Sequence, residues 1–181
     1  GLGDVYKRQE IANVISDLGE ERFARKIAKT ICQTRDEFPL TTTQQLAKLV
    51  ASVVPMNKKD PTQNPATRTF QAIRIHINSE LDELTHALNG AMDVVKDGGR
   101  IAVITFHSLE DRIVKRFFDK AAHPERDIDP RLPLRPDQLP QPLLSDVRRI
   151  LPSKEECAEN PRARSSILRV ATRSRAEDGT C

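Results

Sequence analysis

Residues 98–118 read GGRIAVITFHSLEDRIVKRFF, and this stretch decides the fold class. A glycine pair opens it, as in a tight turn, and residues 101–106 form an unbroken run of apolar and β-branched side chains. A run that is apolar on both sides predicts an interior strand of a parallel sheet, covered by helices on both faces. Ser108 and Asp111 then have the spacing of a capping box, which predicts the start of a helix. Turn, strand and helix in this order are typical of an α/β sheet.

The residues before this stretch predict helices without strands. In residues 10–54, apolar side chains recur every three or four positions, with Gly19 as a stop signal, which predicts three helices in a small α-helical subdomain. Residues 56–63 are polar and predict a linker. The same periodicity over residues 65–88 predicts one long helix.

The residues after it give weaker signals. Residues 121–152 are rich in proline and predict an irregular excursion with a short helix near residues 143–150. Residues 166–172, SILRVAT, predict a final strand, and residues 176–181 predict a frayed end.

Composition excludes several classes of protein. A net charge of +3 and a pI near 8.9 permit a nucleic-acid partner without requiring one. Aromatic residues make up 4% of the chain, which argues against a surface that stacks several bases. Cys32, Cys157 and Cys181 are far apart and form no CxxC pair, so we expect neither a disulfide framework nor a zinc site. No apolar run approaches the roughly 20 residues of a membrane helix.

The first nine residues are set apart from the fold. DVYKRQ, residues 4–9, looks like a translated sequencing adaptor, and the chain has no initiator methionine. We therefore expect that the sequence is a fragment of a longer protein.

A candidate site follows from the predicted sheet. Ligands of open α/β sheets bind beyond the carboxyl ends of the strands, which indicates residues 105–108. The helix that begins there offers free backbone N–H groups to an anion. Arg112 together with Lys115 or Arg116 forms a cationic stripe that suits an RNA backbone.

Three other sites are rejected on spacing. His107, Ser108 and Asp111 are too close along the chain to converge as a hydrolase triad. His76, His86 and His107 lack the compact spacing of zinc ligands, and no glycine-rich phosphate loop with its lysine lies between strand and helix. Purely structural roles stay open as alternatives to a binding site: His107 as a histidine that only ends the strand, and Ser108 as a helix cap.

Four blocks of sequence resemble one family. They are LGEERFARKIA at residues 18–28, NPATRTFQAIRI at 64–75, FHSLEDRIVKRFF at 106–118 and ENPRARSSILR at 159–169. Together they are similar to the MraW (RsmH) family of S-adenosyl-methionine-dependent 16S rRNA (cytosine-N4) methyltransferases. One departure is Asn64, where the family usually has histidine; both residues can cap a helix.

The resemblance implies an α/β fold: the C-terminal half of a class I (Rossmann-like) methyltransferase domain, preceded by part of an α-helical insert domain. Residues 10–60 would belong to the insert and residues 61–181 to the methyltransferase half. The family's glycine-rich first turn, its ribose-binding acid and the motif after its fourth strand have no counterpart here. S-adenosyl-methionine would therefore be bound mainly by a missing N-terminal half, and no catalytic or cofactor-binding residue is assigned to this chain.

The implied function is methylation of the exocyclic N4 of a cytidine in 16S ribosomal RNA, by a cytoplasmic protein of which this fragment is inactive alone. The implied partner is 16S rRNA or the small ribosomal subunit, with no membrane and no metal. A non-catalytic RNA-binding module of helical and α/β parts is the alternative. From position and residue type, the candidates for RNA contact or for lining the cleft are Arg68, Arg74, Asn78, His107, Ser108, Arg112, Lys115, Arg162 and Arg164.

Overall fold

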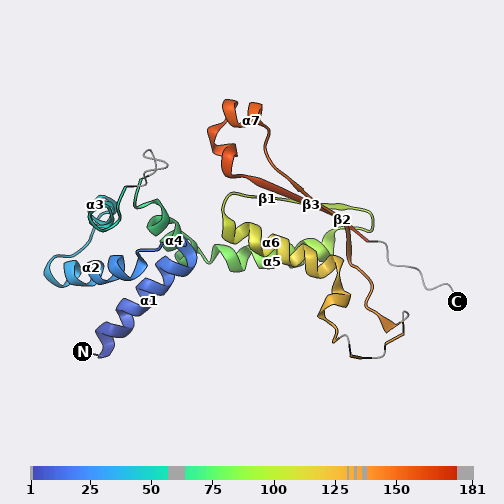
Figure 1. Ribbon diagram of the computed structural model, residues 1–181, viewed down its shortest axis with the longest axis horizontal. Helices are drawn as coiled ribbons and strands as arrows, with labels where there is room; N and C mark the ends of the chain where they lie inside the picture. Colours follow the sequence, from blue (N-terminus) through green and yellow to red (C-terminus); the bar gives the residue numbers. More distant parts are fainter. Residues whose placement is uncertain (1, 57–63, 130, 133, 136–137, 175–181) are drawn as a thin grey trace. The chain divides into compact units, whose positions relative to one another are not determined.

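The computed structural model describes residues 2–56, 64–129, 131–132, 134–135 and 138–174, in two compact units (Figure 1). The first unit ends at Glu80 and the second begins at Leu81. The predicted linker, except its first residue, the predicted domain boundary at residue 60 and the predicted frayed end lie outside the described residues. Within the described residues, none of the helices combines the length and the apolar character that crossing a bilayer requires.

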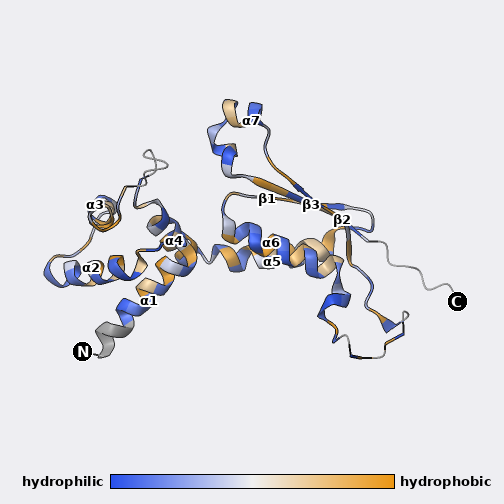
Figure 2. Ribbon diagram, viewed as in Figure 1, coloured by the Kyte–Doolittle hydropathy of each residue, from blue (hydrophilic) through white to orange (hydrophobic). Residues whose placement is uncertain are grey.

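The first unit is built from helices, as predicted: α1 (Leu2–Gly19), α2 (Ala24–Glu37), α3 (Thr43–Val53) and α4 (Thr67–Asn78). Apolar and polar residues alternate around α2, and its apolar side joins a core that contains Ile15, Ile27 and Val50 (Figure 2). α1 ends at Gly19, which confirms the predicted stop. Residues 2–9 form the first turns of α1, and their origin in an adaptor stays a prediction.

Helices α1 and α4 approach each other closely at Gly19. A Cβ atom added to Gly19 would lie 2.6 Å from the carbonyl oxygen of Arg68 and 3.2 Å from Cβ of Ala72. Arg68 also donates a hydrogen bond from Nη1 to the carbonyl oxygen of Glu20, at 2.9 Å. The end of α1 is therefore held by α4, which belongs to the same compact unit.

The predicted long helix over residues 65–88 is wrong, because two helices occupy this region. α4 ends at Asn78, the C-cap Ser79 has a left-handed backbone (φ 50°), and α5 (Glu80–Val94) begins directly after it. The apolar spacing continues through Ser79, so periodicity alone gave no sign of the break.

The second unit places helices against a three-stranded sheet. Its strands are β1 (Arg100–Thr105), β2 (Leu144–Ile150) and β3 (Ile167–Arg173), in the spatial order β1-β3-β2 with β3 antiparallel to both neighbours. α5 and α6 (Ser108–Ala122) lie together against one face of this sheet (Figure 1). The core between them contains Leu88, Ile101, Val114, Phe118 and Ala171. Shorter helical segments complete the unit: η1 (Pro124–Asp127), α7 (Lys154–Glu159) and η3 (Pro161–Ser165).

Two predictions for this unit are wrong and two are confirmed. Strand β1 matches the predicted strand at 101–106, and β3 matches the predicted final strand. However, β1 pairs antiparallel with β3, and in the described chain helices cover only its Ile101 side, leaving Ile104 60% exposed. Residues 144–150 form β2 and not a short helix, because they pair with β3, a partner distant in sequence.

We predict that Gly19→Ala lowers the free energy of unfolding by about 1–3 kcal/mol, because the new methyl group overpacks the contact with α4. Gly90→Ala is the matched control: nothing lies within 4 Å of its added Cβ, and alanine should stabilise the interior of α5 by about 0.5–1 kcal/mol. Urea unfolding followed by circular dichroism measures both. Equal effects of the two substitutions would contradict the close approach of α1 and α4.

Candidate functional site

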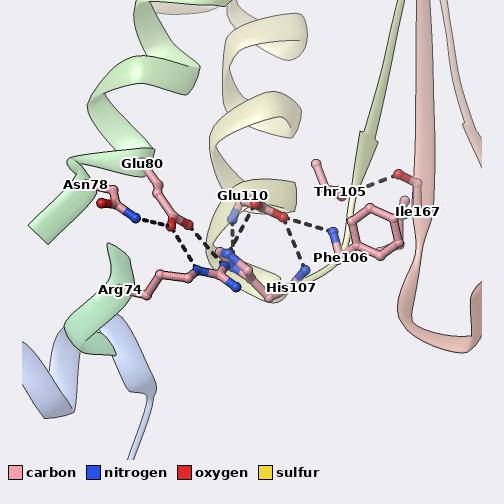
Figure 3. A network of polar contacts seen from close by, with 8 residues as sticks. All are labelled: Arg74, Asn78, Glu80, Thr105, Phe106, His107, Glu110 and Ile167. Carbon is pink, nitrogen blue, oxygen red and sulfur yellow. Dashed lines mark hydrogen bonds and ion pairs between the residues drawn. The ribbon is translucent and has the colours of Figure 1, made fainter. Parts of the chain in front are cut away.

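The junction between β1 and α6 is organised by a capping box one residue earlier than predicted. His107 is the N-cap: its Nδ1 accepts the N–H of Glu110 at 3.4 Å. The Glu110 carboxylate reaches back and accepts the N–H of Phe106 at 2.9 Å and that of His107 at 3.4 Å (Figure 3). The prediction that Ser108 and Asp111 form the box is wrong, because His107 keeps an extended backbone (φ −139°, ψ 163°) and Ser108 is already helical.

The ionised Glu110 carboxylate holds this junction together by accepting hydrogen bonds. Burial raises the pKa of Glu110, but hydrogen bonds from His107 and from the Phe106 N–H outweigh it, so the pKa lies below its ordinary value. Glu110 Oε1 also lies 3.2 Å from His107 Nε2, at ion-pair distance but without the alignment of a hydrogen bond. With both oxygens engaged, Glu110 positions the loop rather than serving as a free base. His107 acts here as the helix cap, a role that the sequence predicted for Ser108.

Asp111 does not cap α6 but makes an ion pair with the buried Arg169 of β3. Arg169 donates from Nε to Oδ1 at 2.7 Å and from Nη2 to Oδ2 at 3.0 Å, and the side chains of Arg169 and Asp111 are 9% and 17% exposed. The hydrogen bonds from Arg169 lower the pKa of Asp111 despite its burial, and the charges of Arg149 and Lys115 add to this. Sequence reasoning missed Arg169; a lone cation within the apolar run SILRVAT was the available signal.

Several predicted residues meet at one end of the sheet. Thr105, the last residue of β1, pairs with Ile167, the first of β3, and donates a hydrogen bond to its carbonyl oxygen at 3.3 Å (Figure 3). η3 directly precedes β3, so its exposed Arg162 and Arg164 lie at the same end of the sheet as the start of α6. Ser108 begins α6, and both Arg112 and Lys115 are exposed on it.

The remaining candidates belong to the first unit, where they make contacts of their own. Arg74 forms a bidentate pair with the Glu80 carboxylate, from Nε at 2.8 Å and from Nη2 at 3.0 Å, and Asn78 donates to the same carboxylate at 3.3 Å (Figure 3). Arg68 holds the carbonyl of Glu20, as described above. These contacts give all three residues a structural role, and their contact with RNA stays a prediction.

Gly98 and Gly99, the glycine pair before β1, form a turn. Gly98 (φ 76°) donates to the carbonyl of Arg173 at 2.9 Å, and the carbonyl of Gly99 accepts from Arg173 N–H at 2.8 Å. A Cβ atom on Gly99 would lie 2.7 Å from the carbonyl oxygen of Lys96, so the turn itself requires this glycine. The pair lies at the amino end of β1, and His107 follows the other end of this strand. In the part of the chain that the structure describes, no group of three or more His, Cys, Asp or Glu could hold a metal ion.

Comparison with known proteins matches residues 3–174 to the MraW methylase family. The chain belongs to this family. Its relatives include proteins named Ribosomal RNA small subunit methyltransferase H from Cupriavidus pinatubonensis (54% identical over 172 residues, 91% of this chain and 51% of the relative), Ralstonia pickettii (52%, 91% and 53%) and Bordetella petrii (53%, 91% and 45%). The family resemblance drawn from the four sequence blocks is thus confirmed. This member of the MraW methylase family spans about half the length of the curated relatives it matches.

We predict that His107→Ala lowers the free energy of unfolding by about 0.5–2 kcal/mol, because α6 loses its N-cap. His107→Asn should retain most of the stability, since asparagine is a strong N-cap residue. Thermal unfolding of the two variants provides the comparison. If asparagine costs as much as alanine, capping is not what His107 contributes.

We predict that Asp111→Asn costs about 3–5 kcal/mol, because it leaves the Arg169 charge buried without its partner. In the unmodified chain, the lowered pKa makes this contribution fully present above the ordinary pKa of aspartate and lost as the pH falls through the lower pKa of the folded state. Urea unfolding at neutral and at acidic pH measures both effects.

Asp146→Asn is the matched control, because Asp146 pairs with Arg148 at 2.8 Å on the exposed surface and should cost only about 0–1 kcal/mol. Asparagine also tolerates the left-handed backbone at this position (φ 51°). A loss at Asp111 no larger than at Asp146 would show that the Arg169 pair does not hold α6.

Proposed function

We propose that this chain forms the C-terminal part of an S-adenosyl-methionine-dependent enzyme that methylates the exocyclic N4 of a cytidine in 16S ribosomal RNA. The match to the MraW methylase family over residues 3–174 carries this proposal, and the names of the relatives support small-subunit ribosomal RNA as substrate. For the same reason we propose that the enzyme works in the cytoplasm, where ribosomes are assembled.

The chemistry of the target decides what the protein must provide. The N4 amine of cytosine is a weak nucleophile because its lone pair is delocalised into the ring. Much of the acceleration must therefore come from holding the amine in line with the methyl donor. The base must also leave its stack to enter a pocket. Rigid placement of the RNA is thus the contribution expected of residues outside the cofactor site.

The residues that the structure describes suit the role of positioning RNA. The junction held by His107 and Glu110 makes one rigid rim at the carboxyl end of β1. Exposed cations at the same end of the sheet, on α6 and η3, can contact phosphate groups, which position RNA without reading its bases. We assign this role to Arg112, Lys115, Arg162 and Arg164.

The unpaired edge and the exposed apolar face of the three-stranded sheet support the proposal that the enzyme has a second half. β3 pairs with one edge of β1, and within the described residues no strand pairs with its other edge. On the side of the sheet opposite α6, Ile104 and Ile150 are 60% and 46% exposed. Unpaired edges and bare apolar faces are liabilities that proteins normally cover. We propose that the further length of the relatives includes this cover and most of the S-adenosyl-methionine site, so the chain alone is inactive and marginally soluble.

We predict that the isolated chain gives no S-adenosyl-methionine binding signal in calorimetry. A full-length family member containing these residues should bind it and methylate a 16S rRNA transcript at N4 of a cytidine, detected by mass spectrometry of the nucleosides. Arg112→Gln with Lys115→Gln should weaken RNA binding without changing cofactor binding.

Micromolar or tighter binding of the cofactor by the isolated chain would overturn the missing-half proposal. RNA binding by the full-length protein without methyl transfer would favour the non-catalytic RNA-binding module instead. Lys154→Gln combined with Lys96→Gln gives a control with the same change of charge at two exposed positions outside α6 and η3.

A further inference from the structure

Helix α2 of the first unit presents an exposed stripe of four cations that the proposed site does not use. Arg25, Lys26 and Lys29 lie on α2, and Arg22 lies in the turn just before it. On α2, Arg25 and Lys29 lie one turn apart on the same side, over about 6 Å, and Lys26 lies next to them. Ala24, Ile27 and Ala28 are buried on the opposite side. We call these four residues the α2 stripe.

The α2 stripe works against the stability of its own helix. Cations favour the carboxyl end of a helix, where Arg35 lies. Arg25 and Lys26 instead occupy the first turn of α2, which has no acidic residue, and Asp36 and Glu37 share the last turn with Arg35. Arg25 and Lys29 are also like charges four residues apart, an unfavourable pair. Helix stability therefore gives no reason for this arrangement, and binding of an anion would relieve both costs.

Among the residues that the structure describes, no carboxylate is paired with the α2 stripe. The stripe's side chains make no hydrogen bond or ion pair to other residues that the structure describes. Glu21, close to the start of α2, is 6% exposed and accepts the Phe23 N–H at 2.9 Å, so it is turned inward. Within the residues that the structure describes, the result is a positive surface without a paired carboxylate.

We infer that the α2 stripe binds the phosphate backbone of RNA, an inference that rests on the proposed function for its choice of polyanion. A row of cations without base-reading aromatics suits phosphate contacts, which supply affinity and register without sequence preference. A lipid surface fits less well, because a membrane-bound helix inserts its apolar side, and the apolar side of α2 is packed in the core around Ile27.

The test compares two double variants of the full 181-residue chain. Arg25→Gln with Lys29→Gln neutralises the stripe, and Lys48→Gln with Lys96→Gln removes the same charge from exposed positions elsewhere. The probe is a fluorescein-labelled single-stranded RNA of mixed sequence, titrated by fluorescence anisotropy at several salt concentrations. The stripe variant should bind more weakly at low salt, and its slope of log K against log salt should shrink by about 0.7 for each lost phosphate contact. The control should keep the slope of the unmodified chain.

Folding is monitored separately. The stripe variant should keep its helical circular dichroism and unfold at the same or a higher temperature, because unfavourable charges are removed. Arg25→Lys should retain the salt slope. Equal slopes for the two double variants would overturn the inference, as would stripe-dependent binding to phosphatidylglycerol vesicles with unchanged binding to RNA.

The inference and the proposed function fail in different ways. If a full-length family member methylates 16S rRNA but neutralising its stripe leaves RNA binding unchanged, the inference falls and the function stands. If RNA binding depends on the stripe but no methyl transfer occurs, the function falls and the stripe remains an RNA contact.

Discussion

The buried pair between Asp111 and Arg169 is the interaction on which the second unit depends. It joins the first turns of α6 to the central strand β3 by two hydrogen bonds of 2.7 and 3.0 Å. A bidentate arginine and carboxylate pair has a fixed planar geometry, so it sets the orientation of α6 as well as its distance from the sheet. Burial of two charges costs solvation energy that the pair only partly recovers. The benefit of the pair is therefore the placement of α6, from which Arg112 and Lys115 project.

The residues between β1 and α6 also serve to position the start of α6. His107 and Glu110 have the chemistry of catalytic groups, yet both are engaged in closing the turn. Hydrogen bonds to the Glu110 carboxylate keep it ionised, which in turn secures the N–H groups of Phe106 and His107. These hydrogen bonds make the junction rigid at the point where β1 ends and α6 begins, and the proposed function assigns RNA contacts to exposed residues near it.

Carboxylates balance positive charge at some places in each unit, as at Arg74 in the first, and leave it unbalanced at others. In the second unit, Arg169 is compensated inside the core, and Arg126 and Arg148 pair with acidic neighbours at the surface. In the first unit, the α2 stripe stays uncompensated although the helix would be more stable otherwise. A net charge of +3 conceals this contrast, because it is the local balance that determines where a polyanion can bind.

The sequence by itself determined the family, the helices α1, α2 and α3, the strands β1 and β3, and the end of α1 at Gly19. These follow from signals contained within a few residues: apolar periodicity, a stop glycine and four collinear motifs. Only the tertiary structure decided the break at Ser79, the strand β2, the shift of the cap to His107 and the partner of Asp111. Arg169 lies 58 residues from Asp111, and β2 becomes a strand only through its pairing with β3. Such contacts depend on the path of the chain in space, which local patterns do not encode.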